Sequence, residues 1–176
     1  IDRLTLAPGI AGDSAQVVDL IAEVQVEDRR LMVESRGSLG ATDRFAFKID
    51  AEPDGDVFDM GLDYRASADG AVAGLLGLDD AYRARIVGDG SWTRWNGALV
   101  VRRGDERFAA LKITNRSGRF GLLGQVYPAD VLTGTLASAL GETVSLAANA
   151  TIDDRRIDGD YKLRSRALRL DADGLI

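Results

Sequence analysis

The sequence offers few side chains that could carry out chemistry. Its 176 residues include no histidine and no cysteine, which excludes histidine bases, thiolate nucleophiles, disulfides and the usual zinc ligand sets. Ser14 and Ser91 each follow a Gly-Asp or Asp-Gly pair, but neither lies in a nucleophile elbow, and no Ser-His-Asp triad can form. A Ser-Lys pair would need Lys48, Lys112 or Lys162, and no spacing places one near a serine. We therefore predict a protein that is not an enzyme and that has no cofactor and no metal.

Acidic residues cluster between positions 50 and 63 and could form a calcium site or a carboxylate pair. The Asp-Gly-Asp centre at positions 54–56 lacks the remaining spacing of a calcium loop, including its closing glutamate. The other members fall on the outward side of a predicted strand. We interpret the cluster as a solvated face and turn, as we do Asp171 and Asp173. The cluster contains Asp50, Glu52, Asp54, Asp56, Asp59 and Asp63.

Two further groups have a structural and a functional interpretation. A basic stretch near the end of the chain could touch anionic lipid head groups, although such residues more often solvate an outer face and protect sheet edges. Trp92 and Trp95 flank a turn, where closing one end of a sheet is favoured over anchoring at a membrane interface. The basic residues are Arg155, Arg156, Lys162, Arg164, Arg166 and Arg169.

Composition narrows the class of protein. Hydrophobic residues make up 45% and charged residues 28% of the chain, which is typical of a globular protein, and no segment is long enough to cross a bilayer. The formal net charge of -6 argues against nucleic acid as the main partner.

The main structural signal is alternation with a period of two residues, which predicts β-strands with one apolar face. Short polar links separate about a dozen such runs, and short links join antiparallel neighbours. We therefore predict an all-β antiparallel meander. The residues of its apolar wall are Val24, Val26, Leu31, Val33, Phe45, Phe47, Ile49, Phe58, Met60, Leu62, Tyr64, Ile86, Leu99, Val101, Leu111, Ile113, Phe120, Leu122, Val126, Val144, Leu146, Ile152, Ile157, Tyr161, Leu163, Leu168 and Leu170.

Two segments lack this alternation. Residues 68–78 and 128–140 are rich in alanine and leucine and suit short amphipathic helices. Each segment is followed by a similar series of strands, and the two series are offset by about 62 residues, which suggests a repeat. We expect residues 1–176 to form one fragment of a longer array, with approximate units at 62–127 and 128–176 and a preceding unit at 1–61.

Several motifs resemble the TamB-type translocation and assembly module proteins, which belong to the AsmA-like superfamily of bridge-like lipid transfer proteins. They are LDYRA at 62–66, the Gly/Leu helix, LDDAYRARI at 78–86 and GDGSWTRWNG at 88–97. Weaker similarity continues through GRFGLLGQVYP at 118–128 and DDRRIDGDYKL at 153–163. The motifs are strand and turn sequence rather than catalytic signatures.

The resemblance implies a location and a function. It implies an internal segment of a protein in the periplasm of a Gram-negative bacterium, whose full-length form is anchored in the inner membrane. The sheet would curl into an elongated open groove, a β-taco, that binds phospholipid acyl chains and conducts them to the outer membrane. An outer-membrane partner of the Omp85 type would contact other parts of the protein.

Alternatives remain open at this stage. A closed core between two sheets would also explain the alternation, but the wall contains many small residues and only 6% of the chain is aromatic, which favours a groove over a densely filled core. A second function is an assembly factor whose edges template strands of nascent outer-membrane proteins. A carbohydrate-active β-solenoid enzyme ranks last, because its carboxylates would have to line the apolar side.

Overall fold

The alternating segments form β-strands in the computed structural model, which describes residues 3–6, 16–128, 140–153 and 156–175. One short helix, α1, spans Ala71–Leu76. The strands are β1 (Arg3–Leu6), β2 (Gln16–Glu27), β3 (Arg30–Leu39), β4 (Asp43–Ala51), β5 (Phe58–Ala66), β6 (Tyr82–Gly90), β7 (Arg94–Arg103), β8 (Glu106–Arg116), β9 (Arg119–Val126), β10 (Val144–Asp153), β11 (Arg156–Arg164) and β12 (Arg169–Leu175).

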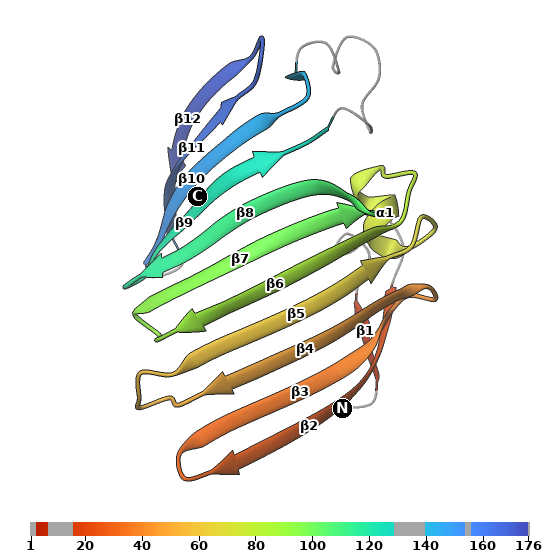
Figure 1. Ribbon diagram of the computed structural model, residues 1–176. Helices are drawn as coiled ribbons and strands as arrows, with labels where there is room; N and C mark the ends of the chain where they lie inside the picture. Colours follow the sequence, from red (N-terminus) through yellow and green to blue (C-terminus); the bar gives the residue numbers. More distant parts are fainter. Residues whose placement is uncertain (1–2, 7–15, 129–139, 154–155, 176) are drawn as a thin grey trace.

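All twelve strands belong to one sheet. They follow one another in chain order, and each pair of neighbours is antiparallel, as Figure 1 shows. The predicted all-β antiparallel meander of about a dozen strands is therefore confirmed.

Tight turns enforce much of this order because each makes the strands on either side of it neighbours. Longer links join β1 to β2, β5 to β6 and β9 to β10. Two residues link β2 to β3, and both have positive φ, with 48° at Asp28 and 67° at Arg29. Ser117 and Gly118 link β8 to β9 in the same way, with φ of 53° and 84°. Positive φ at both central residues gives a hairpin turn whose twist matches that of the strands.

The helix predicted over residues 68–78 is present but shorter. It ends at Gly77, whose φ of 64° lets its N–H bond back to the carbonyl of Ala73. The helix predicted over 128–140 lies outside the described residues except at its two ends. Residues 61 and 62, the predicted boundary between repeat units, lie inside β5, and the repeat itself stays a prediction.

No second layer of strands covers the sheet within the described residues. Each strand packs against its hydrogen-bonded neighbours, and α1 packs against β5. The surface area is 11683 Å², about 1.4 times the roughly 8,300 Å² expected for a compact globular chain of 18.8 kDa. The described residues thus form an open sheet rather than a closed sandwich, while the curling of this sheet into a groove stays a prediction.

Candidate functional site: the apolar face of the sheet

Register gathers the predicted wall residues on one face, because directly opposed residues of an antiparallel pair point to the same side. A central row runs across the eleven strands from β2 to β12, about 50 Å at the usual strand spacing. The row consists of Ala22, Ser35, Phe47, Leu62, Ile86, Leu99, Leu111, Gly124, Leu146, Leu163 and Leu170.

Further rows flank the central one on the same face, which we call the apolar face. One holds Val24, Val33, Ile49, Met60, Gly88, Gly97, Ile113, Leu122, Ala148, Tyr161 and Ala172. The row on the other side holds Leu20, Gly37, Phe45, Tyr64, Ala84, Val101, Ala109, Val126 and Val144. No charged residue occurs in any of the three rows.

Several predicted wall residues lie outside these three rows. Val26, Leu31 and Phe58 follow the same register at one end of the face. Ile152 and Ile157 pair with each other in β10 and β11, but their side chains lie outside the described part of the chain. Leu168 precedes β12 and lies in the turn rather than in a row.

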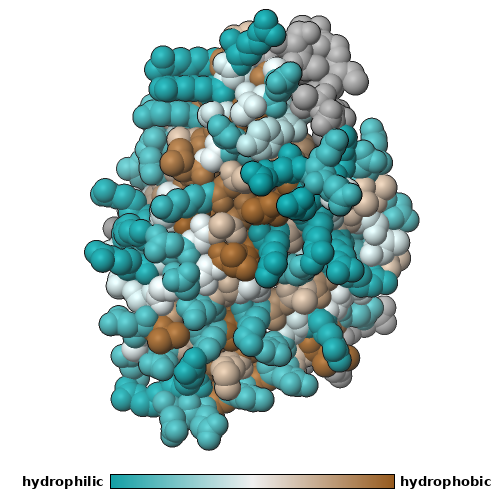
Figure 2. Space-filling view, in the orientation of Figure 1, coloured by the Kyte–Doolittle hydropathy of each residue, from teal (hydrophilic) through white to brown (hydrophobic). Residues whose placement is uncertain are grey.

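Exposure along the apolar face is uneven. Most side chains from β3 to β10 are partly buried by their neighbours on the same face. Val24 and Val26 on β2 are 60% and 73% exposed, and Phe120, Tyr161 and Leu170 are also exposed. Figure 2 shows one side of the molecule, which is mostly hydrophilic and carries separate hydrophobic patches. Apolar side chains therefore also reach the surface on this side.

An aromatic cluster closes one end of the apolar face. Trp95 is only 6% exposed and lies over two glycines opposed in β6 and β7, Gly88 and Gly97, where a Cβ would overlap its ring. The ring of Phe58 lies 4.3 Å from that of Trp92 and 6.4 Å from that of Trp95. The tryptophans therefore pack at the end of the sheet, the arrangement favoured from sequence.

A buried aspartate holds the opposite end. Asp43 has no exposed surface, and its carboxylate accepts hydrogen bonds from the Tyr64 hydroxyl at 2.9 Å, the Ser67 N–H at 2.8 Å and the Val72 N–H at 3.1 Å. The last bond satisfies a free N–H in the first turn of α1. Burial and the bond to Asp43 raise the pKa of Tyr64. Asp43 thereby fixes α1 at the end of the apolar face.

A β-bulge adds a second aromatic pair at this end. Val101 pairs with Ala109 and Arg102 with Arg107, so Phe108 is an extra residue in β8. Such a bulge re-aims side chains, and here Phe108 meets the buried Tyr82 ring edge-on at 5.2 Å. Neither Asp43 nor Phe108 was predicted as a wall residue, because each depends on contacts between distant parts of the chain.

The opposite face of the sheet, the polar face, carries paired charges. Arg30 bonds Asp50 at 2.6 Å, and this hydrogen bond lowers the pKa of Asp50. Lys48 bonds Glu34 at 2.6 Å, which raises the pKa of Lys48. Three members of the acidic cluster, Asp50, Asp54 and Asp63, form ion pairs with arginines. The described residues contain no group of three or more carboxylates placed to hold a metal ion.

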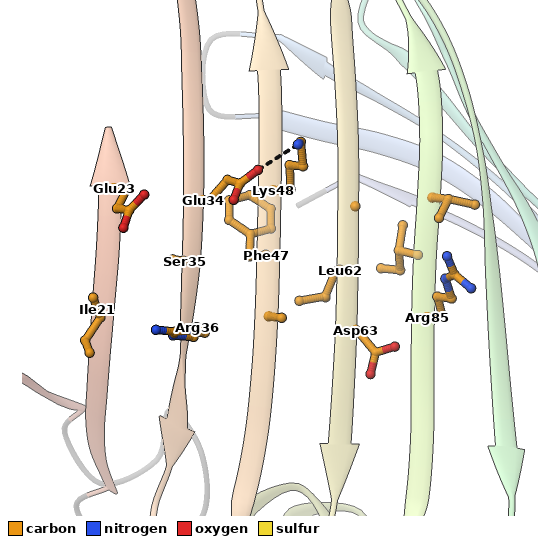
Figure 3. A pocket seen from close by; sticks show the side chains of 14 residues that line it. Ile21, Glu23, Glu34, Ser35, Arg36, Phe47, Lys48, Leu62, Asp63 and Arg85 are labelled. Carbon is orange, nitrogen blue, oxygen red and sulfur yellow. Dashed lines mark hydrogen bonds and ion pairs between the residues drawn. The ribbon is translucent and has the colours of Figure 1, made fainter. Parts of the chain in front are cut away.

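A hollow of about 420 Å³ lies mainly on the polar face between β2 and β6. Figure 3 shows Glu34 on β3 joined to Lys48 on the neighbouring strand β4, and Arg36, Asp63 and Arg85 line the same hollow. Its lining contains three acidic and three basic residues, and this mixture suits a solvated surface.

Ser91, the candidate nucleophile among the described residues, is held within its own turn. The Ser91 hydroxyl lies 3.3 Å from that of Thr93 and accepts the Arg94 N–H at 3.0 Å, so it stabilises the turn between β6 and β7. Ser14 lies outside the described residues, as does Arg155 of the basic stretch. Within that stretch Lys162, Arg164, Arg166 and Arg169 are exposed.

Comparisons with known proteins identify no family for this chain: no family model, curated protein or solved structure matches it. Among the described residues no helix is long and apolar enough to cross a membrane.

Proposed function

We propose that the chain is a lipid-conducting segment whose apolar face binds phospholipid acyl chains. The observation that carries this proposal is the uncharged central row, which crosses eleven strands without a covering layer among the described residues. Soluble monomers rarely leave an apolar surface of this length without a covering layer unless it binds something.

The physical basis is simple transfer from water to an apolar surface. Each buried methylene gains about 0.8 kcal/mol, so a two-chain lipid crosses water too slowly without a protein surface. A continuous apolar row offers similar contacts at each step of about 4.8 Å from strand to strand. The lipid moves without a chemical step, so no catalytic residue is needed.

The resemblance to TamB-type proteins supports the same proposal and supplies its setting. The segment would be part of a periplasmic bridge between the inner and outer membranes, with the sheet curled into a groove. An inner-membrane anchor and a partner of the Omp85 type would belong to other parts of that protein.

An assembly factor for outer-membrane proteins is the second candidate. It is favoured by the two terminal strands of the sheet, β1 and β12, each of which pairs with one neighbour among the described residues. A strand edge can add an extended peptide by β-augmentation. This function would use the backbone of the edge strands rather than the apolar face.

Photocrosslinking from adjacent positions on opposite faces tests the lipid proposal. We would place benzoylphenylalanine at Leu62 or at Asp63, and at Leu99 or at Ala98, and incubate each variant with phosphatidylethanolamine vesicles. We expect lipid adducts at Leu62 and Leu99, whose side chains lie in the central row, and none at Asp63 and Ala98.

Equal labelling at both members of each pair, or no lipid adduct, would contradict the proposal. Crosslinking to an added outer-membrane protein peptide from β12, with no lipid adduct at Leu62, would instead support the assembly factor.

A further inference from the structure

Five arginines stand in one line across five neighbouring strands. Arg44 in β4 opposes Arg65 in β5, which opposes Arg83 in β6, and the line continues through Arg102 in β7 to Arg107 in β8. We call these five residues the arginine row. Each is the second residue from the same end of its strand, so the row follows one rim of the sheet over about 19 Å at the usual strand spacing. The bulge at Phe108 is what brings Arg107 into line with Arg102.

Like charges placed directly opposite each other destabilise a sheet, and few carboxylates offset them here. Asp63 pairs with Arg83 and lies 3.9 Å from Arg65. Arg44 and Arg102 donate to backbone carbonyls. Among the described residues, Asp63 is therefore the one carboxylate that forms ion pairs with the five arginines. All five arginine side chains are exposed. A repulsive arrangement that the fold retains points to an anionic ligand.

An apolar helix lies at the same rim. α1 follows β5 and precedes β6, and the Asp43 carboxylate, next to Arg44 in the chain, holds its first turn. Leu75 on this helix is 52% exposed. Because Asp43 and Tyr64 belong to the apolar face, α1 and the arginine row flank the rim from opposite faces.

We propose that this rim docks on the surface of a bilayer that contains anionic phospholipids. Guanidinium groups bind phosphate with two parallel hydrogen bonds, and arginines about 5 Å apart can share one head group. An exposed leucine beside basic residues fits the boundary between head groups and acyl chains. A nucleic acid would gain nothing from Leu75, and the net charge of -6 opposes it.

Other charged residues near this rim affect its docking on an anionic surface. Arg103 engages Asp80 at 3.5 Å and Glu106 at 3.3 Å. Asp69 and Asp79 flank α1 in the chain and are exposed, so they oppose an anionic surface. Replacing both by asparagine is expected to strengthen docking.

The test measures sedimentation of the chain with vesicles of phosphatidylcholine, with and without 30 mol% phosphatidylglycerol, at several salt concentrations. Each arginine near an anionic surface is worth about fivefold in binding, so Arg102→Gln with Arg107→Gln is expected to weaken it about 25-fold. The control, Arg29→Gln with Arg30→Gln, removes the same charge from arginines already paired with Asp54 and Asp50. It is expected to change binding less than twofold.

Leu75→Gln separates a bilayer from other polyanions. It is expected to weaken vesicle binding several-fold while leaving any binding to a single-stranded oligonucleotide unchanged. Equal losses in the arginine variant and its control, or binding that ignores phosphatidylglycerol, would overturn the proposal. So would tighter binding to the oligonucleotide than to the vesicles. Circular dichroism of each variant verifies the fold, and since the arginine row lies on the polar face, docking can fail while acyl-chain binding persists.

Discussion

A charge placed in the central row should abolish lipid binding and leave the sheet folded. Leu146 in β10 opposes Gly124 and Leu163, and its side chain is partly buried. Burying a leucine completely is worth about 1.5–3 kcal/mol, so Leu146→Asp should cost about 1–1.5 kcal/mol of unfolding free energy in a one-layer sheet. In a closed core, where an unpaired charge would be buried, the cost would exceed about 4 kcal/mol.

The carboxylate introduced by Leu146→Asp should weaken lipid binding. An acyl chain lying on the row would strip water from it at a cost of at least about 3 kcal/mol, which corresponds to roughly 150-fold weaker binding. Ala147→Asp is the matched control, because it adds the same charge one residue away on the polar face, opposite Leu123 and Lys162. We expect the control to change lipid binding less than twofold.

The assay combines thermal unfolding by circular dichroism with binding of a fluorescent phospholipid. Loss of the folded state in Leu146→Asp would refute the open sheet and favour a closed core. A folded variant with unchanged binding would show that lipid does not pass Leu146. Equal losses in Leu146→Asp and Ala147→Asp would refute the assignment of faces.

Three further outcomes follow from the described contacts. Asp43→Ala should lower the free energy of unfolding by about 3–4 kcal/mol, since three hydrogen-bond donors lose their acceptor at about 1 kcal/mol or more each; a loss under 1 kcal/mol in a urea titration would contradict this. Because the pKa of Tyr64 is raised in the folded chain, the unfolded chain releases that proton first. Stability should therefore decline above about pH 10, and less so in Tyr64→Phe, as urea titrations at pH 8 and 11 can show. A cysteine at Asp59 should react with a polar maleimide faster than one at Met60, since these residues lie on opposite faces; the reverse order would mean that the register is wrong.

The sequence predicted the strands, their antiparallel order and most residues of the apolar face. Alternation is a local property, because successive side chains of an extended backbone point to opposite sides whatever the rest of the chain does. For this reason Phe58, Met60, Leu62 and Tyr64 could be placed on one face before any neighbour was known. Where the links are short, they make consecutive strands neighbours.

Tertiary structure alone decided what lies beside and above that face. An apolar face reads the same in sequence whether a second sheet buries it or solvent reaches it, so the open sheet depended on long-range packing. The capture of α1 by Asp43 joins residues 29 apart in the chain, and no local pattern encodes such a bond. The arginine row likewise requires the register of five strands and the bulge at Phe108, because a shift of one residue between neighbours would move an arginine to the other face.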